Sequence, residues 1–212
     1  GITDMFKEDH LSFRQRKYMK VKNIIGRALG GIGLVVLSPV YLAIIVAIKK
    51  EDGITAPVFF SQKRVGIHKE YFNLYKFRSM RADAEKNGAV WASAGDARVT
   101  RFGRFIRKVR IDELPQIWNI LKGDMSFIGP RPERMAFVQK LKETIPYYSL
   151  RHTVKPGLTG WAQVCYPYGA SEEDARRKLE YDLYYIKNMS ILLDINIIFK
   201  TVGVVLFPKG AR

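Results

Sequence analysis

The chain is organised around the stretch Arg107-Lys-Val-Arg-Ile-Asp112-Glu113-Leu-Pro115-Gln-Ile-Trp-Asn-Ile-Leu-Lys-Gly123-Asp-Met-Ser-Phe-Ile-Gly-Pro130-Arg131-Pro132-Glu133. Two adjacent carboxylates stand between a basic segment and a short amphipathic helix, and a second basic elbow follows at residues 129–132. Asp112 suits the N-cap of that helix, Pro115 its first turn, and Gly123 its end. Its expected apolar face consists of Leu114, Ile117, Trp118 and Leu121.

The adjacent carboxylates Asp112 and Glu113 could serve phosphate chemistry. In mid-helix, neighbouring side chains diverge by about 100° and share a ligand poorly, but at a helix start both can turn toward one point. The N–H groups and the dipole there favour an anion such as a phosphate. Asp112 is then a candidate nucleophile on phosphorus and Glu113 a candidate Mg²⁺ ligand, while Arg107 and Arg131 could pair with phosphate oxygens.

Each of these features also has a simpler interpretation. Taken alone, an Asp-Glu pair before Leu-Pro is more often a helix cap than a catalytic pair. The sequence Pro130-Arg131-Pro132 could equally be a stiff surface turn. The functional interpretation depends on the rest of the chain.

The composition predicts an anionic partner. The chain has 212 residues, enough for one domain with an appendage, and carries 36 Lys and Arg against 20 acidic residues, a formal net charge of +16. Such an excess favours nucleic acid, a phosphorylated small molecule or an anionic bilayer surface as partner. The single cysteine, Cys165, excludes an intramolecular disulfide framework and a multi-Cys zinc site.

Residues 28–48 contain no charged side chain and predict a membrane segment. As a helix they would extend about 31 Å, enough for a hydrocarbon layer of about 30 Å. Ser38-Pro39 interrupts the run: Pro breaks the helix, and the Ser hydroxyl can bond to a freed carbonyl. Basic residues flank both ends, so a re-entrant hairpin, which keeps both flanks on one side, is favoured over a single crossing. A buried helix of a soluble protein is the third possibility.

Two further segments complete the predicted surroundings of the carboxylates. Residues 1–23 predict a basic arm beside the membrane. Residues 58–66 and 70–80 predict a β-hairpin, in which Lys76 and Arg78 share one face. Both could bind phosphate, although basic residues on an edge strand are often merely solvated.

The remaining segments are predicted from periodicity and turn residues. They are a loop over the site at 81–100, a basic amphipathic helix at 101–110, a helix at 134–150 interrupted by Pro146, a glycine-rich loop turning extended at 154–164, a charged helix at 171–189, and an apolar helix at 191–207. Polar residues disfavour a membrane crossing by the last of these, which should pack on the domain or lie at the interface.

Several motifs together resemble a known family. They are Ser38-Pro39, Gln62-Lys-Arg64-Val-Gly66, Lys76-Phe-Arg78-Ser-Met80, Thr100-Arg101-Phe-Gly103-Arg104, Asp112-Glu113-Leu-Pro115-Gln116, Lys122-Gly-Asp124-Met-Ser126-Phe-Ile-Gly129-Pro-Arg131-Pro132 and Lys155-Pro-Gly157-Leu-Thr-Gly160-Trp-Ala-Gln163. From about residue 20 to the end, the sequence resembles the catalytic domain of the bacterial sugar transferases, the monotopic phosphoglycosyl transferases.

The resemblance implies transfer of a sugar-1-phosphate from a nucleoside diphosphate sugar, with UDP as the expected carrier, to a polyprenyl (undecaprenyl) phosphate, with release of nucleoside monophosphate. By motif, Asp112 would attack the sugar-linked phosphate to form a covalent intermediate, Glu113 would bind Mg²⁺, and Arg107 would contact phosphate. Residues Arg131, Lys76 and Arg78 are the other expected phosphate contacts. Such transfer is the first membrane step in assembling exopolysaccharide, capsule, O-antigen or other glycans.

The expected fold is α+β: a mainly helical, membrane-associated domain with a re-entrant helix-break-helix hinged at Ser38 and Pro39, amphipathic interfacial helices and a small β-hairpin. Residues 1–23 would form the juxtamembrane arm, 24–50 the re-entrant helix and 51–212 the catalytic domain on the cytoplasmic face of the bacterial inner membrane. The chain is expected to be the catalytic end of a larger family form. Anionic lipids are expected partners and nucleic acid is not, while association with a second copy stays open.

Two alternatives remain open. The chain could be a non-catalytic, basic, membrane-anchored module that binds anionic lipid. It could also catalyse the same transfer by direct displacement, without a covalent intermediate.

Overall fold

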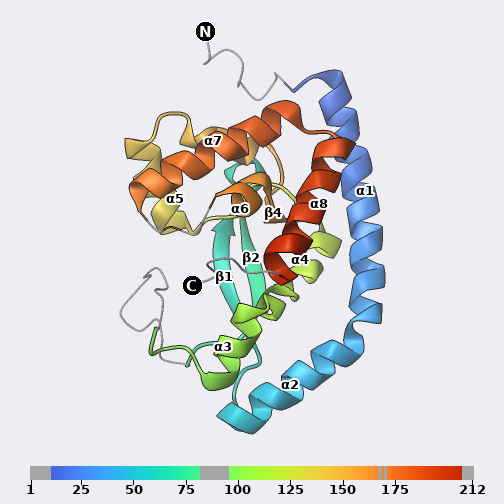
Figure 1. The fold of residues 1–212 in the computed structure, drawn as a ribbon, viewed down its shortest axis with the longest axis vertical. Helices are drawn as coiled ribbons and strands as arrows, with labels where there is room; N and C mark the ends of the chain where they lie inside the picture. The colour runs from blue at the N-terminus through green and yellow to red at the C-terminus, as the bar shows by residue number, and fades with distance from the viewer. Residues whose placement is uncertain (1–10, 82–95, 167–168, 170, 207–212) are drawn as a thin grey trace.

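The computed structural model describes residues 11–81, 96–166, 169 and 171–206, and its α+β class matches the prediction. The helices are α1 (Phe13–Val36), α2 (Ser38–Asp52), α3 (Arg101–Lys108), α4 (Gln116–Lys122), α5 (Met135–Thr144), α6 (Trp161–Cys165), α7 (Glu172–Asn188) and α8 (Ile191–Leu206). The strands are β1 (Phe59–Val65), β2 (Tyr71–Phe77), β3 (Ser126–Ile128) and β4 (Gly157–Thr159). Three short 3₁₀ turns are η3 (Ile67–Lys69), η4 (Ile111–Glu113) and η5 (Tyr148–Thr153). Helix α1 follows one long side of the domain and α2 turns beneath it (Figure 1).

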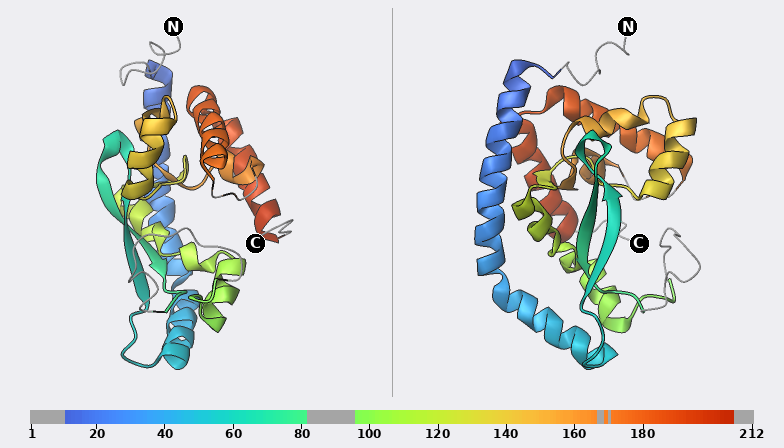
Figure 2. Two further views of the ribbon diagram at one scale, coloured as in Figure 1. Left: turned by 90° about the vertical axis from the view of Figure 1, so that its left-hand side faces the viewer. Right: turned by 180° about the vertical axis from the view of Figure 1, so that it is seen from behind.

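The predicted hairpin is confirmed. Strands β1 and β2 pair antiparallel from Phe59↔Phe77 to Val65↔Tyr71. Leu74 packs with Ile120 and Met125 on one side, whereas Phe77 packs with residues of α2 and α3 on the other. The hairpin therefore lies on one face of the domain and contacts both the α4 region and the α2–α3 region, and α8 lies on the opposite face (Figure 2). The last residue of β2, Phe77, is therefore buried in the interior of the domain.

A second, parallel sheet was not predicted. Strands β3 and β4 pair through Ser126↔Gly157 and Ile128↔Thr159. Each has only three residues, too few for a periodic pattern. The expected extended continuation is also wrong, because residues 161–165 form α6, which packs on α7 and α8.

The β3–β4 contact requires glycine at position 157. A Cβ built there would lie 2.1 Å from the backbone nitrogen of Gly129. We expect Gly157→Ala to lower the free energy of unfolding by about 1–3 kcal/mol, as overpacking typically does. Gly203→Ala on α8 is the matched control, since a Cβ there meets nothing within 4 Å. Chemical denaturation of both variants tests this, and equal stability of the two would contradict the packing argument.

The helix break at Ser38-Pro39 is confirmed. Helix α1 ends at Val36, α2 begins at Ser38, and the pair is bent by 59°. Ser38 Oγ donates a hydrogen bond of 2.8 Å to the carbonyl of Val35, as expected for a hydroxyl that satisfies a backbone group freed by proline. None of the described helices is alone long and apolar enough to cross a membrane, while this bent pair meets the length and composition requirements together.

The first half of α1 is fixed to the domain by polar contacts. Lys22 Nζ bonds to the carbonyl of Ile128 at 2.9 Å and pairs with Asp194 at 2.8 Å. Arg27 Nε donates to the carbonyl of Leu121, and Gly26 and Gly30 lie buried, with α4 side chains nearby. Helix α1 continues without a break through residues 23 and 24, so the basic segment and the start of the apolar run share one helix.

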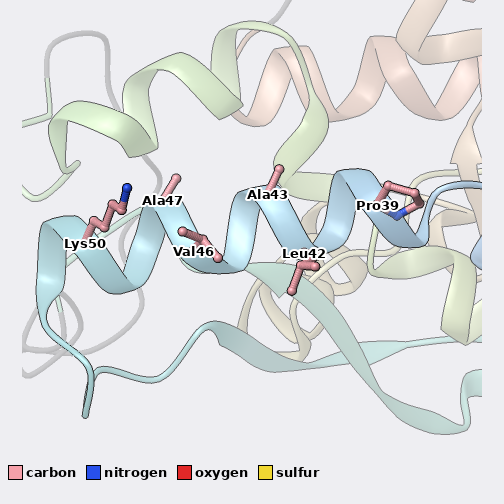
Figure 3. A pocket seen from close by; sticks show the side chains of 6 residues that line it. All are labelled: Pro39, Leu42, Ala43, Val46, Ala47 and Lys50. Carbon is pink, nitrogen blue, oxygen red and sulfur yellow. The ribbon is translucent and has the colours of Figure 1, made fainter.

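Large apolar side chains lie exposed on three helices. They include Ile24, Ile25, Leu29, Ile32, Val35 and Val36 on α1, Val40, Leu42 and Val46 on α2, and Ile191, Leu192, Ile195, Ile198, Phe199, Val202, Val204 and Val205 on α8. An open groove of about 540 Å³ follows α2 from Pro39 to Lys50 and is lined by alanine, leucine and valine in between (Figure 3). Helix α8 nevertheless packs on the domain, as one of its predicted placements required, through Asp194, which accepts bonds from Tyr18 and Tyr185.

Candidate active site

The two central carboxylates lie in η4, and both residues are 7% exposed. Arg110 adopts a left-handed conformation (φ 60°) and turns the chain into η4. The predicted N-cap role of Asp112 is wrong: Arg110 precedes η4, Pro115 precedes α4, and neither turn has a side-chain cap. The predicted end at Gly123 is confirmed by its φ of 97°. Both carboxylates are therefore buried in a 3₁₀ turn, and neither side chain caps a helix.

Glu113 is held by two cations from distant segments. Lys76 Nζ lies 2.8 Å from Oε1, and Arg131 contacts Oε1 through Nη2 at 2.5 Å and Oε2 through Nη1 at 3.3 Å. Burial alone would raise the pKa of Glu113, but the charges and hydrogen bonds of Arg131 and Lys76 outweigh it and hold that pKa well below the ordinary value. Glu113 is thus an ionised anchor for both cations.

Asp112, in contrast to Glu113, has no paired cation among the described residues and no lowered pKa. Within the described ranges, its carboxylate receives no hydrogen bond. Burial raises its pKa above the ordinary value of 3.8, Lys76 opposes this increase, and the charge of Glu113 adds to it. An ionised Asp112 would keep its oxygens available to a ligand, since no described residue donates a hydrogen bond to them.

Arg131 reaches the dyad because the sheet β3–β4 holds the elbow that carries it. Gly129 N donates to Thr159 O and Gly157 N donates to Pro130 O, both at 2.9 Å. Arg64 of β1 donates to the carbonyl of Pro132. The elbow is therefore tied to two sheets, which excludes the alternative of a simple surface turn.

The remaining predicted phosphate-binding residues behave differently. Lys76 contacts the dyad directly, so it does not belong to a merely solvated edge. Arg107 is partly exposed and its charge acts on both Asp112 and Asp96. Arg78 lies beyond the end of β2 and donates to the carbonyl of Met80 at 3.0 Å. The binding roles of Arg107 and Arg78 remain predictions, and most of the loop expected over the site lies outside the described residues.

Two supporting residues were missed by sequence reasoning. Asn119 is fully buried, accepts from Tyr75 N and donates to Asn73 O, which fixes α4 to β2. Tyr41 of α2 donates a 2.6 Å bond to the carbonyl of Leu114, directly after the dyad. A polar residue inside an amphipathic helix could have indicated Asn119, whereas no local pattern distinguishes Tyr41.

The donor chemistry of the dyad is compatible with Mg²⁺. Within the described part of the chain, no group of three or more His, Cys, Asp or Glu side chains could hold a metal ion. Mg²⁺ does not need such a cage, because it commonly binds one or two carboxylates together with water and substrate phosphates. Asp112 offers oxygens without hydrogen bonds, while those of Glu113 are already shared with Lys76 and Arg131.

The arrangement can bind a phosphorylated molecule and attack it. Lys76, Arg107 and Arg131 surround the carboxylates with positive charge that can neutralise phosphoryl oxygens. The partly exposed Arg131 and Arg107 can reach a ligand, whereas Glu113 is almost enclosed.

Comparison with known proteins identifies the family of the chain. Residues 17–208 match the family described as bacterial sugar transferase. The chain is 47% identical over its full length to the UDP-N-acetylgalactosamine-undecaprenyl-phosphate N-acetylgalactosaminephosphotransferase of Aeromonas hydrophila, covering 51% of that protein. It is 41% identical, over 93% of its length and 41% of the relative, to the UDP-glucose:undecaprenyl-phosphate glucose-1-phosphate transferase of Xanthomonas campestris pv. campestris. The Escherichia coli (strain K12) protein of the same name is 40% identical over 80% of this chain and 36% of its own length.

The chain belongs to the bacterial sugar transferase family. It spans about half the length, or less, of these three relatives.

Proposed function

We propose that the chain transfers a sugar-1-phosphate from a UDP-sugar to undecaprenyl phosphate and releases UMP. The observation that carries this proposal is the contrast within the dyad. Asp112 is buried without a hydrogen bond from the described residues, and Glu113 beside it is bonded to two cations. The names of the relatives supply the class of donor and acceptor.

The proposed chemistry has two displacements. An Asp112 carboxylate oxygen attacks the phosphorus that bears the sugar, the bond from that phosphorus to the bridging oxygen breaks, and UMP leaves with the electron pair. A phosphate oxygen of the acceptor then attacks the same phosphorus and releases the Asp112 carboxylate. Arg107, Arg131 and Lys76 neutralise charge on the transferring group. Glu113 is the residue that would hold Mg²⁺, and the ion would supply further positive charge at the transferring phosphate.

The proposed location is the inner membrane, with the catalytic residues on the cytoplasmic face. The exposed apolar residues of α1, α2 and α8 and the bend at Leu37 support a re-entrant insertion. Cysteines introduced at positions 14–20 should then be shielded from a reagent applied only outside intact cells. Labelling at these positions would favour a complete crossing.

A donor panel combined with a trapping experiment tests the reaction. We expect UMP release from at least one UDP-sugar in the presence of undecaprenyl phosphate. Without acceptor, labelled phosphosugar should remain on the wild-type protein and not on Asp112→Asn. Transfer without such label would favour direct displacement, and lipid binding without transfer from any donor would favour the non-catalytic module.

The pH dependence of the rate should report the surroundings of Asp112. Asp112 must be ionised to attack, so the rate should fall on acidification at a pH above the ordinary Asp value of 3.8. Lys76→Met removes the strongest opposing charge and should move this acid limb to higher pH, whereas Glu113→Gln removes a neighbouring negative charge and should move it lower. Residual rates measured from pH 4 to 9 test this, and shifts in the same direction would contradict the assignment.

A further inference from the structure

A buried charged cluster contacts the backbone of Arg131. Arg151 of η5 is 7% exposed, and its guanidinium makes three polar contacts. Nη1 donates to Tyr148 Oη at 2.7 Å, while Nη2 donates to the carbonyl of Arg131 at 2.8 Å and lies 2.8 Å from Asp182 Oδ2. The guanidinium also lies over the Tyr148 ring, at 5.2 Å from its centroid. Arg151 is thus fixed in one orientation.

These contacts form a continuous connection from α7 to the dyad. Asp182, which is 2% exposed, forms an ion pair with Arg151. Arg151 donates a hydrogen bond to the backbone carbonyl of Arg131, and the Arg131 side chain donates to Glu113. Each link joins segments far apart in the sequence. None of the motifs that predict the active site includes Arg151 or Asp182.

The cluster is difficult to explain as a source of stability alone. Removing two charges from water costs several kcal/mol per ion, and replacing a buried ion pair by well-packed apolar residues is often neutral or stabilising. Burial raises the pKa of Asp182 to about 6 even with Arg151 beside it. The remaining charged neighbours, Glu133 and Lys178, have opposite signs and opposing effects on that carboxyl. A need to orient the backbone of Arg131 would explain why a buried arginine with three polar partners occupies position 151.

We propose that Arg151, oriented by Asp182 and Tyr148, is a positioning residue that holds the Arg131 backbone so that its guanidinium engages Glu113 and the transferring phosphate. The role rests on the proposed transferase function. Without Arg151, the Pro130–Pro132 elbow would keep its links to the sheets but lose the bond that fixes its central residue. Misplacement by about 1 Å can lower a rate by about 10²-fold.

A double-mutant cycle tests the proposal. Arg151→Met should lower kcat about 10- to 100-fold in the wild-type background, with less than a 3-fold further loss in an Arg131→Met background, because the two residues act through one interaction. Equal losses in both backgrounds would overturn the proposal. Lys22→Met is the control, since it removes a partly buried ion pair whose partner is Asp194 and not Arg131 or Glu113, and its effect should be the same factor in both backgrounds.

Two further measurements keep the test decisive if Arg151→Met folds poorly or the assay fails. Asp182→Asn retains an acceptor oxygen for Arg151 and should lose less activity than Asp182→Ala, and equal losses at unchanged thermal midpoints would contradict the role. Hydrogen exchange at the amides of Gly129, Arg131, Glu133 and Arg134 should be faster in Asp182→Ala than in the wild type, and equal exchange would also contradict the role. Exchange needs no turnover, so a wild-type protein inactive with every donor would refute the proposed function separately.

Discussion

Replacing Asp112 by Asn is expected to lower sugar-phosphate transfer by at least about 10³-fold, because an amide cannot form the phosphoryl bond that the proposed mechanism requires. The change is nearly isosteric. The Asp112 carboxylate receives no hydrogen bond from the described residues, and burial already disfavours its charged form. The thermal midpoint should therefore stay the same or rise. UMP release and transfer to undecaprenyl phosphate, measured with the same protein preparation, give the rate.

The control for this prediction is Glu173→Gln. Glu173 is an exposed carboxylate on α7 that pairs only with Arg176 and Arg177 of the same helix in the described structure. Exposed pairs of this kind contribute about 0–1 kcal/mol, so rate and stability should both remain near wild type. Transfer by Asp112→Asn within 10-fold of wild type would exclude Asp112 as the nucleophile. An inactive but unfolded variant is recognised by its thermal midpoint.

Local chemistry made much of the fold predictable. Proline and serine at positions 39 and 38 set the helix break, and alternation predicted the hairpin. Gly123 adopts a positive φ that favours glycine, so the end of α4 could be read directly. In each case the deciding interaction lies within a few residues of the signal.

Interactions between distant segments could not be read in this way. Strands β3 and β4 are stabilised by backbone contact between glycines about thirty positions apart, which leaves no periodic signal. Trp118 was expected on the apolar face of α4 but is 49% exposed, because the buried positions include Asn119 and Ile120. The amide of Asn119 satisfies the edge of β2, and this need overrides the apolar pattern.

In the candidate site, too, residues within local motifs could be predicted, whereas residues brought in by distant segments could not. Its candidate chemical residues, Asp112, Glu113 and Arg131, could be proposed from the sequence because they lie close together within motifs. The supporting residues Arg151 and Asp182 come from η5 and α7, and only the fold brings them behind the elbow. The sequence, in which Asp112 and Glu113 are adjacent, did not indicate that their pKa values shift in opposite directions. Burial raises the pKa of Asp112, whereas two cations lower that of Glu113, so the neighbouring carboxylates differ in how strongly each favours its charged form.

Replacing Glu113 by Ala should abolish transfer and also destabilise the fold. The change leaves Lys76 and Arg131 as neighbouring cations without their shared counter-ion, in a site where Glu113 is 7% exposed. Breaking a buried pair by removing one partner typically costs about 3 kcal/mol or more of unfolding free energy. We expect a loss of that size in chemical denaturation and a fall in transfer rate of at least about 10²-fold.

A second substitution separates the two effects of losing Glu113. Adding Lys76→Met to Glu113→Ala removes one of the uncompensated cations, so a substantial part of the lost unfolding free energy should return. Transfer should not return, because both the anchor of Arg131 and the charge of Lys76 near the phosphate are then missing. Recovery of transfer together with stability would show that Glu113 acts only in folding. Stability without transfer would instead place the Lys76–Glu113 pair in the chemistry, and Lys76→Met alone, which keeps the Glu113–Arg131 contact, gives the share of the loss that belongs to Lys76.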